Sequence, residues 1–180
     1  MATVPTVKTW ATGDRFSSSA MNNGVRTPLQ FLLNGAPFVA LTQSVATAAW
    51  AAGVFADITF DTETADTDSQ HSPSTNPERV VIGTTPGYYL VFGTVAFAND
   101  TTGTTRRARI TKNGVGVDGS QFILPPATLT SVPTVAQVVQ AISSTDYITL
   151  QGYHDASSSI GTAVSATYRS SLTAYFIRSL

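Results

Sequence analysis

"TTPGYYLVFGTVAF" (residues 84–97) is the stretch of the sequence that decides the fold. Its Thr85-Pro86-Gly87 predicts a turn, because proline presets one backbone dihedral and glycine supplies the next. The residues after the turn predict a β-strand that is apolar on both sides. One side carries Tyr89, Val91, Gly93, Val95 and Phe97; the other carries Tyr88, Leu90, Phe92 and Ala96, with Thr94 as its polar member. A sandwich strand with one face in water alternates apolar and polar residues, so this strand is predicted to be covered on both faces.

Two explanations fit a second apolar face. It is a subunit interface, where an aromatic ring is buried and its hydroxyl finds a partner, or both faces are buried inside one small sandwich. Residues 147–153 and 175–176 repeat the pattern more mildly. The residues that we assign to a trimer interface on this basis are Tyr88, Leu90, Phe92, Tyr147, Tyr153 and Tyr175.

Strand signals continue on both sides of this stretch. They are "VFADITF" (54–60), "RRARITKNG" (106–114), "TVAQVVQAIS" (134–143), "DYITLQGYH" (146–154) and "SSLTAYFIRSL" (170–180). Strands at this spacing, with no strong helix between them, predict an all-β sandwich or barrel. We therefore expect one β-domain over residues 38–180.

The preceding stretch, "SSSAMNNGVRTPLQFLLNGAP" (17–37), predicts a short amphipathic helix. Its serines can cap the first turn, and it should end at Asn34-Gly35. Gly24 should weaken the helix, and Pro28 should break or kink it, since proline lacks the amide hydrogen. Either the helix packs on its own sheet, or residues 1–37 form an arm that docks on another subunit or protein. We adopt the arm, with attachment residues Trp10, Met21, Val25, Leu29, Phe31 and Leu32.

Several of these segments resemble known families. "TTPGYYLVFGTVAF", "RARITKNG", "DYITLQGYHDASSSI" and "SSLTAYFI" resemble the strands of C1q/TNF-like jelly rolls, over roughly residues 54–180. "WATGDRFSSSAMNNGVRTPLQFLLNGAP" (10–37) resembles the opening of small virion proteins of actinobacterial tailed phages, of the head decoration or minor tail type. The resemblance implies a homotrimeric C1q/TNF-like jelly-roll β-sandwich that an N-terminal arm mounts on a phage particle.

Composition excludes several classes of function. The chain of 180 residues carries a net charge of −1 with 12% charged residues, which argues against a nucleic-acid binder. It has no cysteine, so thiolate metal sites and cysteine nucleophiles are excluded. No run of about 18 apolar residues predicts a membrane span, and the N-terminal stretch lacks the apolar run of a signal peptide. We expect no membrane partner, no cofactor and assembly in the host cytoplasm.

Few residues suggest chemistry. His71 and His154 are the only histidines, and we expect both at the surface; no enzyme motif accompanies them. An acidic loop at 61–68 contains Asp61, Glu63, Asp66 and Asp68. Calcium binds six to eight oxygen ligands, which a cluster of carboxylates could supply. The sequence leaves three alternatives open: the loop binds an ion, it is solvated, or it pairs with the basic strand 106–112 of a neighbouring subunit.

The function that we expect is therefore structural. The favoured hypothesis is a non-enzymatic, trimeric capsid decoration (cement) protein on the surface of the virion, with the major capsid protein as partner. The alternative is a tail-tip or fibre protein whose arm docks on a tail protein and whose jelly-roll head binds a host-surface glycan, with Tyr153, His154 and Asp155 in a shallow sugar site.

Overall fold

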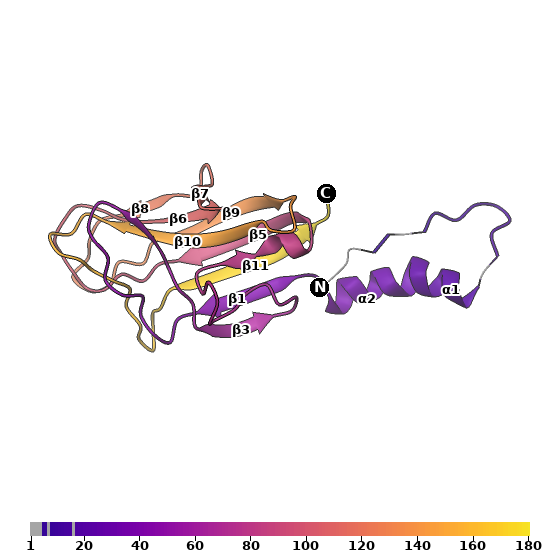
Figure 1. The fold of residues 1–180 in the computed structure, drawn as a ribbon, viewed down its shortest axis with the longest axis horizontal. Helices are drawn as coiled ribbons and strands as arrows, with labels where there is room; N and C mark the ends of the chain where they lie inside the picture. The colour runs from indigo at the N-terminus through magenta and orange to yellow at the C-terminus, as the bar shows by residue number, and fades with distance from the viewer. Residues whose placement is uncertain (1–4, 7, 16) are drawn as a thin grey trace.

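The computed structural model describes residues 5, 6, 8–15 and 17–180, apart from the side chains of Leu32 and Asn34. Two antiparallel sheets stack face to face, and a helical segment projects from one end of them (Figure 1). The all-β jelly-roll architecture with a short N-terminal helix, predicted from the sequence, is confirmed. Among the described residues, the structure has no helix long and apolar enough to cross a membrane.

The β5 sheet has five strands in the order β3-β1-β11-β5-β9. These strands are β3 (Thr62–Asp66), β1 (Phe38–Thr42), β11 (Ser171–Arg178), β5 (Gly87–Thr94) and β9 (Thr134–Ala141). The "TTPGYYLVFGTVAF" stretch thus supplies β5, which pairs with β11 on one side and with β9 on the other. The acidic stretch that the sequence suggested as a loop instead forms β3 at the edge of the sheet, where charged side chains discourage pairing with other chains.

The β10 sheet contains β2 (Phe55–Asp57), β10 (Tyr147–His154), β6 (Arg106–Lys112) and β7 (Val115–Gly116). Two further short strands join it: β4 (Val80–Val81) pairs with β10, and β8 (Phe122–Leu124) pairs with β6. A 3-10 turn, η2 (Ile82–Thr84), connects β4 to the turn before β5. β10 pairs with β6 along the whole length of β6, from Ile148 to His154.

The core lies between the two sheets. Alternate residues of β5 point into it, among them the fully buried Tyr89 and Val91, and Ile148 and Leu150 of β10 face them from the other sheet. At Gly93 the sheets approach so closely that an added Cβ would lie 2.5 Å from Leu150 Cδ1. A side chain at this position would therefore push the sheets apart.

The described part of the chain leaves the other face of β5 uncovered. Tyr88 and Leu90 are half-buried, and Phe92 is 44% exposed. Burial of both faces inside one sandwich, one of the two explanations for the strand pattern, is therefore wrong. The reason is that the sandwich has only two layers, so one face of each sheet looks outward.

The helical segment comprises α1 (Ser18–Met21), a π-helical turn η1 (Asn22–Arg26) and α2 (Thr27–Asn34). Ser17 caps it as expected, because its Oγ accepts from Ala20 N–H at 3.1 Å. Of the two predicted effects of Pro28, a break or a kink, the break is wrong: α2 continues through Pro28, and the helix widens to a π turn just before it. The Thr27 amide bonds back to the Asn22 carbonyl, five residues away, and this wide turn leaves room for the proline ring that follows.

Gly24 also has a structural role in this helix. It is buried, and an added Cβ would lie 2.8 Å from Lys8 Cβ. Lys8 therefore lies against the helix at the position that lacks a side chain. Gly24 allows this close approach, beyond any cost to helix propensity.

The C-terminal end of the helix is fixed to the sandwich. The Phe31 ring packs edge-on against Phe176 at a centroid distance of 5.9 Å, and the Gly35 amide donates to the Phe31 carbonyl. β1 begins three residues later at Phe38. The N-terminal end of the helix points away from both sheets (Figure 1).

Candidate assembly surfaces

The outer face of the β5 sheet carries an apolar surface across four strands. In register, Phe38 of β1 lies beside Tyr175 of β11, which lies beside Leu90 of β5, which lies beside Val138 of β9. The rings of Phe38 and Tyr175 meet at 6.0 Å. Tyr175 and Val138 are 50% and 48% exposed. We call this surface, together with Phe92, the outer β5 face.

Polar groups border the outer β5 face. At one end Gln140 donates to the Tyr88 hydroxyl at 3.2 Å, and the Arg178 guanidinium lies 4.8 Å from the Tyr88 ring centroid. At the other end the hydroxyls of Thr94 and Thr134 are 3.2 Å apart. An apolar centre with a polar border is the usual anatomy of a protein–protein interface.

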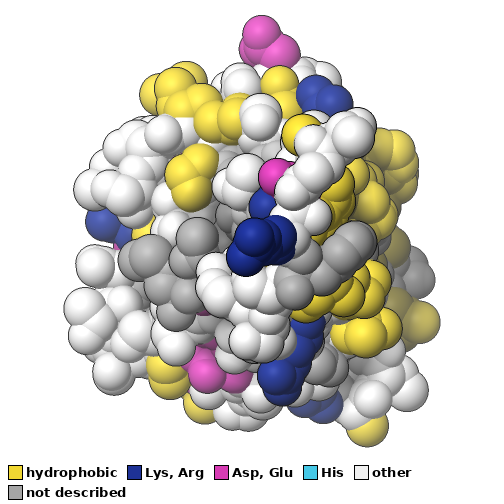
Figure 2. Space-filling view, turned by 90° about the vertical axis from the view of Figure 1, so that its right-hand side faces the viewer, with side chains coloured by type: hydrophobic (Ala, Val, Ile, Leu, Met, Phe, Trp, Pro, Cys, Tyr) yellow, Lys and Arg dark blue, Asp and Glu magenta, His cyan; other side chains and the backbone are white. Residues whose placement is uncertain are grey.

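A second apolar surface lies on the projecting helix. Met21, Leu29 and Leu33 are 42%, 52% and 78% exposed, and with Val25 they line a groove of about 370 Å³. We call these four residues the helix stripe. Seen from the end from which the helix projects, hydrophobic side chains gather along the right-hand side of the molecule (Figure 2).

The structure separates the attachment residues expected from the sequence. Met21, Val25 and Leu29 belong to the helix stripe, together with Leu33, which sequence reasoning missed. Phe31 instead packs against the sandwich. Trp10 is half-buried, with Lys8 Nζ 4.4 Å from its ring centroid, and the Leu32 side chain lies outside the described part of the structure.

The expected trimer-interface residues fall on two opposite faces. Tyr88, Leu90, Phe92 and Tyr175 share the outer β5 face. Tyr147 and Tyr153 lie on the outer side of the β10 sheet, where cations of the same chain cover their rings: Arg79 lies 4.5 Å from the Tyr147 ring and Arg107 lies 4.6 Å from the Tyr153 ring. One flat interface cannot contain both groups.

The expectation of two surface histidines is wrong for His154. It is fully buried beside Trp50, and its Nε2 lies 3.0 Å from the Trp50 carbonyl. Burial, as the largest cause, lowers the pKa of His154 below its usual value. His154 is therefore not available to a sugar site with Tyr153 and Asp155. The side chain of His71 is also enclosed, between Glu63 at 2.8 Å and the Pro77 carbonyl at 3.1 Å.

The basic strand is largely used inside the chain. Arg106, 1% exposed, donates to the carbonyls of Asp100 and Thr102 at 2.8 and 2.9 Å, and the carboxylates of Asp100 and Asp155 each lie 3.6 Å away. Hydrogen bonds from Thr104 and Thr105 lower the pKa of Asp155 to about 2. These contacts tie the loop at 98–105 to the end of β10.

The acidic residues also have partners of their own. Asp61 accepts from the Ser44 and Val45 amides at 2.6 and 2.7 Å. Burial of Asp61 opposes its ionisation, but these hydrogen bonds outweigh it and lower its pKa. Asp66 accepts from the Gln70 and His71 amides, both at 2.9 Å. In the described part of the chain, no three acidic, histidine or cysteine side chains are grouped as a metal site would require.

Comparison with known proteins identifies the fold. Neither family models nor curated proteins match the chain. Among solved structures, it is similar to the globular domain of a zebrafish complement 1qA protein, with a TM-score of 0.58 and 10% identity over 80% of this chain and 99% of that one. It is also similar to murine APRIL, with a TM-score of 0.57 and 14% identity over 78% and 99% of the two chains.

The PRD1 vertex protein P5 is a third similar structure. Its TM-score is 0.54 at 20% identity, over 79% of this chain and 98% of that chain. Since the matched part is nearly the whole of each of these domains and identity is low, the likeness concerns the fold. The β-sandwich of this chain is a C1q/TNF-like jelly roll.

Proposed function

We propose that this chain is a non-enzymatic structural protein of a phage virion: a homotrimeric capsid decoration protein that its N-terminal arm anchors to the head lattice. The observation that carries the proposal is the projecting helix with its exposed helix stripe. A lone helix that holds Met21, Leu29 and Leu33 in water has an unfavourable apolar surface, which a docking partner would remove at about 25 cal/mol per Å².

The outer β5 face supports the trimer. The face is apolar at its centre and polar at its border. The same sheet contacts the C-terminal end of the helix, because Phe176 of β11 packs against Phe31. Three copies joined through this face would carry three arms. Simultaneous docking of linked arms raises retention through effective concentration, without any new kind of contact.

The likeness to the PRD1 vertex protein supports a place on the virion. That similarity concerns the fold, so the location is part of the proposal. The major capsid protein is the partner that a decoration role requires. A tail location remains the alternative, and labelling of particles with an antibody against this chain distinguishes the two positions.

The decisive test adds purified protein to undecorated heads and measures bound copies by sedimentation. We expect saturable binding at the stoichiometry of the lattice. A variant with Met21→Ser, Leu29→Ser and Leu33→Ser should stay folded, because these side chains are exposed, and should lose at least tenfold in affinity. Asn23→Ser, an exposed polar position of the same helix, is the matched control.

Absence of saturable binding by the wild-type protein would exclude the decoration role. Equal binding by the triple variant and by the control would remove the helix stripe from the mechanism, even if the protein does decorate heads.

A further inference from the structure

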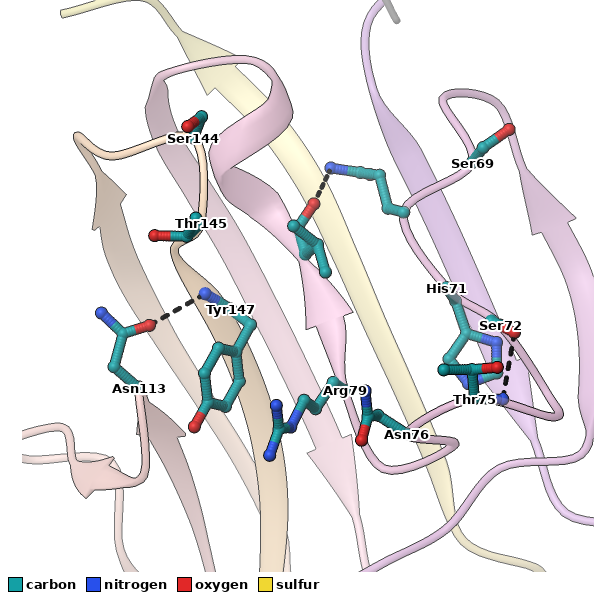
Figure 3. A pocket seen from close by; sticks show the side chains of 12 residues that line it. Ser69, His71, Ser72, Thr75, Asn76, Arg79, Asn113, Ser144, Thr145 and Tyr147 are labelled. Carbon is teal, nitrogen blue, oxygen red and sulfur yellow. Dashed lines mark hydrogen bonds between the residues drawn. The ribbon is translucent and has the colours of Figure 1, made fainter.

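A cavity of about 570 Å³ with a mixed polar and apolar lining lies at the side of the β10 sheet. Its walls come from three loops that are far apart in the sequence: residues 67–79 between β3 and β4, Asn113 at the β6–β7 turn, and residues 142–146 between β9 and β10 (Figure 3). Val81 and Tyr147, which are neighbours in the register of β4 and β10, lie between these walls. Tyr147 is on the outer side of the β10 sheet, so assembly through the outer β5 face leaves this cavity open.

Hydrogen bonds within the chain fix one wall of the cavity. Asp66 accepts from the Gln70 and His71 amides at 2.9 Å, which holds the start of the 67–79 loop. The His71 ring then spans from Glu63 to the Pro77 carbonyl and holds the middle of the loop. These contacts shape the wall without a ligand.

Asp146 fixes the opposite wall. Its carboxylate accepts from the Ile142 and Ser143 amides at 2.8 and 3.0 Å, and from Asn113 Nδ2 at 2.8 Å. Burial opposes the ionisation of Asp146, but these bonds and Lys112 outweigh it, so its pKa lies well below the usual value. Asn113 Oδ1 also accepts from the Tyr147 amide at 3.0 Å, so the side chain of Asn113 is locked in place.

The backbone around the cavity is unusual. Among the described residues, the non-glycine residues with positive φ are Ser69, Asn76 and Asn113, at 53°, 51° and 52°, and all three line this cavity. Asn113 forms the two-residue β6–β7 turn with Gly114, where positive φ is usual, and asparagine adopts it readily. Positive φ at Ser69 costs energy, and such residues concentrate at ligand sites. The cavity is therefore a built feature of the loops and shows the preorganisation that binding sites share.

The chemistry of the lining favours a neutral, hydroxylated ligand. The hydroxyls of Ser69, Ser144 and Tyr147 and the side-chain amide of Asn76 make no hydrogen bond to the described protein atoms. Hydroxyls and amides both donate and accept. Arg79 is the one arginine or lysine among the lining residues, and the Glu78 carboxylate lies 3.0 Å from its Nε.

Other ligand classes fit less well. Ser69, Asn76 and Ser144 are exposed to solvent, and an apolar molecule would displace water from their hydroxyls and amide without replacing its hydrogen bonds. A phosphate or another strong anion would find a single cation that Glu78 already neutralises. The hydroxyls of a sugar, in contrast, supply both donors and acceptors, and its ring can rest against the edge of Tyr147.

We propose that this cavity, between the 67–79 loop and the Asn113 and Ser144 wall, is a binding site for a neutral carbohydrate unit. Asn76, Ser144 and Tyr147 make the polar contacts to it. The proposal does not depend on the oligomeric state or on decoration of heads, so it stands or falls separately from the proposed function.

The test uses the full-length protein and four probes: glucose, galactose, mannose and N-acetylglucosamine. Each sugar is titrated to about 50 mM while amide NMR signals are followed, which detects millimolar dissociation constants. We expect at least one sugar to shift, in a saturable manner, the signals of residues 69–81 and 144–147. In the double variant Ser144→Ala/Tyr147→Phe, affinity for that sugar should fall about tenfold, because each lost hydrogen bond contributes about 0.5–1.5 kcal/mol.

Tyr168→Phe is the matched control, since Tyr168 is a partly exposed tyrosine outside the cavity. The substituted hydroxyls have no partner among the described residues, so all three proteins should fold alike, which their NMR spectra report directly. Two outcomes overturn the proposal: no saturable shift with any of the four sugars, or equal affinity in the double variant and the control.

Discussion

His154 is fully buried at one end of the sandwich, near Arg106, Asp100 and Asp155, and only its neutral form satisfies both ring nitrogens. Nε2 donates to the Trp50 carbonyl at 3.0 Å, while Nδ1 accepts from the Ala156 amide at 3.3 Å. A proton on Nδ1 would face the Ala156 N–H and lose that bond. This geometry and the burial of the ring act in the same direction and lower the pKa of His154.

The lowered pKa makes stability depend on pH. The unfolded chain binds the proton near pH 6.5, and the folded chain binds it only at lower pH. The contribution of His154 to the free energy of unfolding is therefore complete above about pH 6.5 and decreases as the pH falls through the folded-state pKa. Urea unfolding between about pH 8 and pH 5 should show this decrease, and His154→Gln should show less of it.

The window between about pH 5 and pH 8 lies above the usual pKa of an aspartate, near 3.9, and hydrogen bonds lower the pKa values of Asp146 and Asp155 further. If the free energy of unfolding has the same pH dependence in His154→Gln and in the wild type, another group causes the effect.

Sequence alone predicts neither the burial of His154 nor that of Arg106. Both depend on loops 98–105 and 154–158 meeting at one end of the sandwich, and residue type favours the surface for both.

At the scale of elements, the sequence predicts strands well and the helix only in part. β5, β6, β9, β10 and β11 lie within their predicted segments, because alternation and flanking turns mark a strand locally. β1, β3 and β8 lie outside the predicted strand segments. β3 has the composition of a loop, and only its pairing with β1 makes it a strand. Pro28 does not end the helix, since the π turn at residues 22–26 accommodates it, and local propensity does not encode that turn.

Gly24 provides a test of how the N-terminal segment lies on the helix. Gly24→Ala raises helix propensity by about 1 kcal/mol, yet the new Cβ meets Lys8 Cβ. We therefore expect a firmer helix with a displaced N-terminal segment, and trypsin should cleave after Lys8 several-fold faster. Mass spectrometry of timed digests measures the rate.

Asn23→Ala changes the neighbouring, exposed position and serves as the control. Cleavage that is equally fast in both variants would mean that the segment does not depend on contact with Gly24. Proteolysis is suited to this question because it reports the population of the open form.

At the scale of the whole molecule, the two assembly surfaces follow from different parts of the sequence. The apolar second face of β5 was visible as a pattern, but its neighbours Phe38 and Val138 were not, since only sheet order brings β1 and β9 to the same face. The same topology places Tyr147 and Tyr153 on the opposite side. The tyrosines of β5, β11 and β10 show the same alternation along each strand, yet they lie on two different surfaces. The pattern within one strand does not tell which sheet the strand joins.

The outer β5 face carries the last prediction. Light scattering at micromolar concentration should give about three times the chain mass of 18.9 kDa. Phe92→Asp places a charge at the apolar centre of the face without disturbing the core, because Phe92 points outward. Burying that charge without a partner costs several kcal/mol, so the variant should be monomeric at the same concentration and retain its circular dichroism spectrum.

Phe122→Asp is the matched control, because Phe122 is a phenylalanine of similar exposure on β8 of the other sheet. It should remain trimeric. A wild-type protein that is monomeric at micromolar concentration would contradict the trimer, and loss of the trimer in both variants would contradict its location. A trimer lost only in Phe92→Asp would place the trimer contact on the outer β5 face and leave the helix stripe of each arm exposed for a partner on the virion.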